Sequence, residues 1–175
     1  MNKKEVKLYN ILLPIWILIF CPTWLWLFLI PANYLIDRLV LRWSLGALPD
    51  KGLFCRKHTW KICIAGFFGD LCGAVVLFSI FAVATFVEDG SPLFSLLDRI
   101  GQGVASDPFN SFVAFITVAI SVAVSGLMIF CIDRYILAKA GLDAEQAHKS
   151  ALWMAVITAP YLYFFPSRLL SSNWL

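Results

Sequence analysis

One aspartate, Asp70, is the residue of this chain best placed to do chemistry, because it lies in the middle of a long apolar segment. Residues 62–87 contain no other charged side chain. A helix rises about 1.5 Å per residue, so Asp70 lies roughly 13 Å beyond Lys61. A carboxylate at that depth in a bilayer costs about 2.5–3.5 kcal/mol on insertion scales. The sequence therefore predicts either an ion or proton site or a structural carboxyl that is paired or protonated.

Other polar side chains are expected at a similar depth. Asn33 and Asp37 share one helix face through their i, i+4 spacing. Thr158 precedes a bend at Pro160, where carbonyl oxygens are freed from helix bonds. Side-chain and carbonyl oxygens suit a hard cation, although each residue alone also fits helix packing. The predicted intramembrane site comprises Asp70, Asn33, Asp37, Thr158 and the i, i+4 pair Ser121 and Ser125.

Small residues form a stripe beside Asp70. Ala65, Gly69 and Gly73 recur at i, i+4 and i+8, which gives two overlapping small-xxx-small patterns. Such patterns let the backbones of two membrane helices approach closely. We expect this face to be a helix-packing surface, and we expect a homo-oligomer to form through it.

The composition is that of a membrane protein. The chain has 175 residues, of which 61% are hydrophobic and 14% are charged, whereas a soluble domain has about 25% charged residues. The apolar residues fall in long runs, as in transmembrane helices of about 20 residues. The predicted fold is all-α, a polytopic transmembrane helical bundle with short loops. Residues 1–175 are expected to form a single integral membrane domain.

The expected elements follow from the apolar runs and the residues that interrupt them. A short N-terminal arm, 8–21, measures about 21 Å as a helix, too short for a full crossing. It is either re-entrant or, alternatively, the first part of one kinked helix. Residues 93–105 have the helical spacing of an interfacial helix. The four predicted full spans are residues 24–48, 60–87, 110–138 and 150–170.

The charges orient these spans. Six basic residues lie between positions 38 and 61, whereas the loop 88–107 carries four acids and one arginine. Basic loops face the cytoplasm, so the first region is expected inside and the second outside. The basic tail at positions 1–7 favours a cytoplasmic N-terminus, whereas the alternative of one kinked helix would place the N-terminus outside. The expected location is the inner membrane of a bacterium, with several crossings.

A short similarity suggests an internal repeat. Residues 36–38 and residues 132–134 both read Ile-Asp-Arg, and each follows an apolar helix. A true duplication would give two parallel helix pairs, an architecture found in transporters. The alternative is that Asp-Arg at a helix end reflects only the chemistry of the membrane surface.

Signatures of enzymes and of bound cofactors are missing from the sequence. It contains no GxSxG, HExxH or GxGxxG pattern. The two histidines, His58 and His148, fall in predicted turns. Cys55, His58 and Cys63 do not have the spacing of a zinc site. We expect no enzyme activity, no cofactor and no metal centre.

Two functions from different classes remain open. The first is a channel or transporter subunit that uses the intramembrane carboxylate of Asp70. The alternative is a non-transporting scaffold, accessory, immunity or assembly protein, in which Asp70 pairs with a neighbour. The expected partners are the lipid bilayer, a second copy of the chain or another membrane protein. Nucleic acid is not expected, because the basic residues cluster at the predicted membrane edges.

Overall fold

The computed structural model describes residues 17, 20, 24–46, 48–84, 86–87 and 91–167. Over these residues the structure is all-α and contains no strand, which confirms the predicted class. The elements, in chain order, are α1 (Trp26–Ser44), α2 (Lys51–Ala84), α3 (Pro92–Ser106), the 3-10 helix η2 (Pro108–Asn110), α4 (Phe112–Lys139), α5 (Ala144–Thr158) and the 3-10 helix η3 (Tyr161–Phe164).

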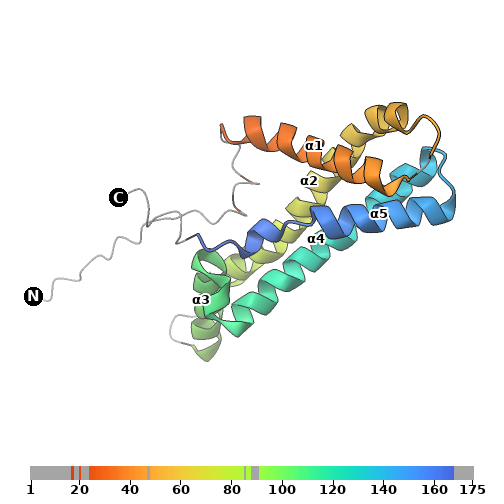
Figure 1. Ribbon diagram of the computed structural model, residues 1–175. Coiled ribbons are helices and arrows are strands. Elements are labelled where there is room, and N and C mark those ends of the chain that lie inside the picture. The colour runs from red at the N-terminus through yellow and green to blue at the C-terminus, as the bar shows by residue number, and fades with distance from the viewer. Residues whose placement is uncertain are drawn as a thin grey trace, which may run out of the picture.

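Two helical hairpins make up the bundle, one from α1 and α2 and the other from α4 and α5 (Figure 1). Their turns lie at the same end, where Gln146 Nε2 of α5 donates a 3.0 Å hydrogen bond to the Ser44 oxygen of α1. Leu41 and Leu137 are fully buried in one core at this end. The helix α3 lies at the opposite end, where its Val104 packs in a second core with residues of α2 and α4.

Two of the helices are long and apolar enough to cross a membrane, judged by length and composition. They cover Lys51–Ile80 of α2 and Phe112–Lys139 of α4. The other two predicted spans have no such helix among the described residues. The helix α1 has 19 residues and includes three charged side chains. The helix α5 has 15 residues, about 22 Å, compared with a hydrocarbon thickness of about 30 Å.

The predicted span 150–170, with its expected bend at Pro160, contains a helix only over its first part. The helix α5 ends at Thr158, and Ala159 has an extended backbone with ψ of 149°. The cause is Pro160, because a proline ring disfavours helical geometry at the residue before it. The chain then turns into η3. This break places Thr158 and the first residues of η3 along one wall of a cavity.

The predicted spans 24–48 and 60–87 imply a basic loop between them, and this prediction is wrong, because α2 already begins at Lys51. Cys55, His58 and Ile62 are buried at i, i+3 and i+7, whereas Arg56 and Lys57 are exposed. This is the pattern of an amphipathic helix. The basic residues therefore occupy the outer face of a helix rather than a loop.

The remaining predicted elements have mixed outcomes. The helix α3 covers the predicted segment 93–105, while its position at a membrane surface stays a prediction. The helix α1 continues through Pro31 without a break. The predicted arm 8–21 lies outside the described residues except for Ile17 and Phe20. The Phe20 ring lies 5.8 Å from the Phe78 ring of α2.

Candidate functional site

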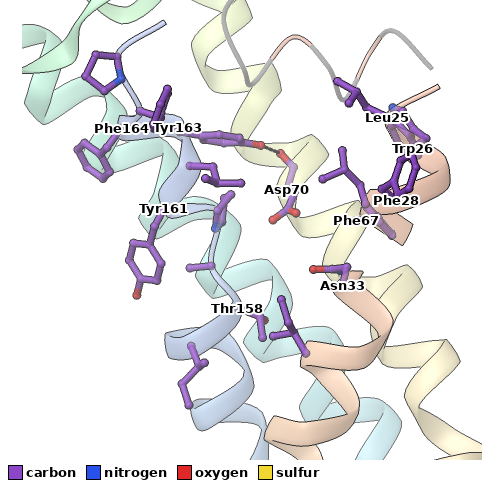
Figure 2. A pocket seen from close by; sticks show the side chains of 18 of the residues that line it. Leu25, Trp26, Phe28, Asn33, Phe67, Asp70, Thr158, Tyr161, Tyr163 and Phe164 are labelled. Carbon is purple, nitrogen blue, oxygen red and sulfur yellow. Dashed lines mark hydrogen bonds between the residues drawn. The ribbon is translucent and has the colours of Figure 1, made fainter. Parts of the chain in front are cut away.

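A cavity of about 720 Å³ is lined by α1, α2 and the segment that runs from the end of α5 through η3. Asn33 of α1, Asp70 of α2 and Thr158 of α5 line it together (Figure 2). Within the described part of the chain, Asp70 is the only charged residue in the lining, and most of the other lining residues are apolar or aromatic. Three of the six residues predicted for the site therefore meet at one surface.

Asp70 is half-buried, and its carboxylate points into the cavity (Figure 2). The Oδ1 atom is buried and has no hydrogen-bond partner among the described residues. The main-chain oxygen of Asp70 accepts a 2.6 Å hydrogen bond from the Tyr163 hydroxyl, which holds η3 against α2. The sequence alone did not select Tyr163, because a tyrosine near the end of a span is also typical of the membrane interface.

Asn33 and Thr158 already use part of their hydrogen-bonding capacity. Asn33 Nδ2 lies 3.9 Å from Cys63 Sγ of α2, a weak contact. The Thr158 hydroxyl donates a 2.8 Å bond to the Met154 oxygen, one turn back in its own helix. The Thr158 hydroxyl therefore already has a partner for its hydrogen, whereas Asp70 Oδ1 accepts no hydrogen bond from the described residues. Among the described lining residues, Asp70 is the one with a buried side-chain oxygen that has no hydrogen-bond partner.

Asp37 is buried in the bundle and is not among the described residues that line the cavity. Its side chain is only 2% exposed, and its Oδ2 atom has no hydrogen-bond partner among the described residues. It lies close enough to Asp70 and to Asp133 of α4 to interact electrostatically with both. The bundle interior therefore holds three aspartates on three different helices.

Ser121 and Ser125 do not line the cavity, so their predicted place beside Asn33 and Thr158 is wrong. Both are fully buried on α4. The Ser121 hydroxyl donates a 2.7 Å bond to the Gly73 oxygen of α2. These serines belong to the contact between α2 and α4. The i, i+4 spacing correctly predicted that the two serines share one face of α4, but that face packs against α2 rather than facing the cavity.

The stripe of small residues packs within the chain. A Cβ atom at Gly69 would lie 2.5 Å from Ile129 Cγ1. A Cβ atom at Gly73 would lie 2.8 Å from the main-chain oxygen of Ser121. Both glycines therefore touch α4, and Ala65 is buried as well. The face expected to meet a second copy of the chain is covered by α4 of the same chain, and the formation of an oligomer stays a prediction.

Asp133 is a residue that sequence reasoning missed. It was expected at the membrane edge beside Arg134, but its side chain is 0% exposed, and neither carboxylate oxygen has a partner among the described residues. The similarity of residues 36–38 to residues 132–134 was the available signal. That alignment makes Asp133 the counterpart of Asp37, which had been selected.

We expect Asp133→Leu to raise the stability of the protein. A buried polar group without a hydrogen bond costs about 1–3 kcal/mol, and leucine has the same branching as aspartate. Thermal unfolding in detergent should show a gain of that order. The control Asp98→Leu, on the exposed face of α3, should change stability by less than about 0.5 kcal/mol. A loss of stability in Asp133→Leu would mean that the carboxylate has a stabilising partner.

The arrangement favours binding of a positive charge over coordination of a metal ion. Among the described residues, no group of three or more His, Cys, Asp or Glu side chains is placed to hold a metal. One carboxylate with an unsatisfied oxygen faces a largely apolar cavity. Comparisons with known protein families, curated proteins and solved structures gave no match.

Proposed function

We propose that this chain is a small polytopic membrane protein that binds a cation at Asp70 and acts as a channel or transporter subunit. The observation that carries the proposal is the Asp70 carboxylate, which has an unpartnered oxygen and faces a cavity of about 720 Å³. It belongs to α2, a helix long and apolar enough to cross a membrane. Ionisable groups in such helices mark substrate and ion pathways by default.

The surface of the bundle supports a membrane location. Leu27 and Phe28 of α1, Phe78 of α2 and Leu127 of α4 are all more than half exposed. Large exposed apolar surface is rare on soluble monomers and is what lipid would cover. In this proposal α1 and the α5–η3 segment complete four crossings beside α2 and α4.

The distribution of charge supports one orientation. Both hairpin turns lie at the same end of the bundle, and this end carries Arg42, Lys51, Lys139 and Lys149. Basic ends face the cytoplasm. We therefore place the turns of both hairpins inside and α3 outside. The bacterial inner membrane and a cytoplasmic N-terminus remain part of the proposal.

The test is flux through the purified protein in liposomes. A gradient of H⁺, Na⁺, K⁺ or an organic cation is imposed, and the internal concentration is followed with time. We expect at least one of these cations to cross faster than it crosses protein-free liposomes. Equal rates with and without protein, for every cation, would contradict the proposal.

One observation also favours the alternative, a non-transporting scaffold. The cavity would admit an arginine or lysine side chain of a partner, which would pair with the Asp70 carboxylate. Purification in mild detergent would then recover a second membrane protein with the wild-type chain, and Asp70→Asn would lose it. Recovery of the chain alone would exclude this partner and leave the cation as the occupant.

A further inference from the structure

The walls of the cavity narrow the kind of cation that it can hold. Eight of its lining residues are aromatic, among them Trp26 of α1, Phe67 of α2 and Phe164 of η3. The Trp26 and Phe67 rings are stacked, with centroids 5.5 Å apart. Aromatic faces attract cations through their quadrupole, most strongly where water is excluded.

The described lining of the cavity holds few polar side chains with which to replace the hydration shell of a small metal ion. The hydroxyls of Thr158 and Tyr163 donate to main-chain oxygens, as does that of Tyr161, which bonds to the Val156 oxygen at 2.6 Å. Small hard cations need about six oxygen ligands. The described lining supplies one carboxylate as its single charged ligand among mostly apolar residues, so a strongly hydrated ion is poorly matched.

We propose that the cavity binds a hydrophobic organic cation, with Asp70 as its counter-ion and the aromatic walls around its apolar body. The volume of about 720 Å³ lies within the range of about 300–1,000 Å³ for sites of drug-sized ligands. The charges are complementary, because the described lining carries one acid and no basic residue. This inference rests on the proposed function and names its substrate class.

The test compares two ions of the same shape and opposite charge, tetraphenylphosphonium and tetraphenylborate. Binding to the purified protein is measured by equilibrium dialysis, with empty detergent micelles as the blank. We expect the wild-type chain to bind tetraphenylphosphonium above the blank and not to bind tetraphenylborate. Equal binding of the two ions would overturn the inference, because it would show that apolar contact alone accounts for binding.

Three variants test whether the Asp70 carboxylate is the counter-ion of the bound cation. Asp70→Asn should weaken tetraphenylphosphonium binding at least about tenfold, since a desolvated charge pair loses one member. Asp70→Glu should retain most of the binding, and Asp98→Asn, outside the cavity, should not change it. Unchanged binding in Asp70→Asn would overturn the inference. If Asp70→Asn does not fold, the comparison of the two ions on the wild-type chain still decides.

The inference and the proposed function fail in different ways. If tetraphenylphosphonium does not bind but flux of Na⁺, K⁺ or H⁺ depends on Asp70, the substrate class is wrong and the proposed function stands. If there is neither binding nor flux, both are wrong. Binding of tetraphenylphosphonium that depends on Asp70 supports both.

Discussion

Asp70→Asn is expected to lower cation flux through the reconstituted protein at least about tenfold. Asparagine has nearly the same size and shape as aspartate, so the cavity and the Tyr163 hydrogen bond to the main chain of residue 70 should persist. What is lost is the negative charge. A cation that leaves water for an apolar cavity then has no counter-ion, and uncompensated burial of charge is strongly unfavourable.

Two further variants separate a charge effect from damage to the fold. Asp70→Glu keeps the charge and should keep most of the flux. Asp98→Asn removes an exposed acid of α3 and should leave flux unchanged. Elution by size-exclusion chromatography and helicity by circular dichroism should match those of the wild type in all three. Full flux in a folded Asp70→Asn protein would show that this carboxylate is not the cation site.

Gly73→Ala is expected to destabilise the bundle by about 1–3 kcal/mol, the usual cost of overpacking a tight contact. The added Cβ would collide with Ser125 Oγ and lie 2.8 Å from the Ser121 oxygen. The helix α4 must therefore move away from α2. That movement also weakens the bond that Ser121 Oγ donates to the Gly73 oxygen.

The matched control is Gly66→Ala, the same change in the same helix. A Cβ at Gly66 would meet only Asn33 Nδ2, at 3.8 Å, which is ordinary contact. Alanine favours helices over glycine by about 0.8–1.0 kcal/mol, so this variant should be as stable as the wild type or more stable. Thermal unfolding in detergent compares the two. Equal midpoints would contradict the tight contact between α2 and α4.

The two long apolar helices were predictable because hydropathy and length depend on local sequence alone, although the start of α2 was not. The helix α4 lies within a residue or two of the predicted bounds 110–138. The failures occurred where charge or proline was given the wrong weight. Arg56 and Lys57 looked like a loop but lie on the exposed side of α2. The apolar run continues past Pro160 to residue 170, but α5 ends at Thr158 because of that proline.

The depth of the candidate-site residues along their helices was predictable from the sequence, but the side to which each residue faces was not. Asn33, Asp70 and Thr158 were grouped because they were expected at similar depths, and they do line one cavity. Ser121 and Ser125 had equally suitable depth, but they face α2. A hydropathy pattern does not fix how a helix is rotated about its axis when all of its faces are apolar. That rotation decides which polar residues meet.

Asp133 shows a second limit. An acid next to an arginine near a helix end resembles an ordinary membrane-surface pair, and sequence gives no measure of its burial. The burial of Asp133 follows from tertiary packing, because α1, α2 and α5 pack around this end of α4. The core that they form includes Leu41 of α1 and Leu137 of α4. Only the similarity between the two Ile-Asp-Arg segments linked it to Asp37.

Infrared difference spectroscopy of the purified protein tests most directly whether Asp70 binds the cation. Spectra with and without tetraphenylphosphonium are subtracted, and the carboxyl and carboxylate bands are compared between variants. We expect a cation-induced carboxylate signal in the wild type and in Asp98→Asn, and its loss in Asp70→Asn. A signal of unchanged size in Asp70→Asn, or none in the wild type, would contradict this expectation.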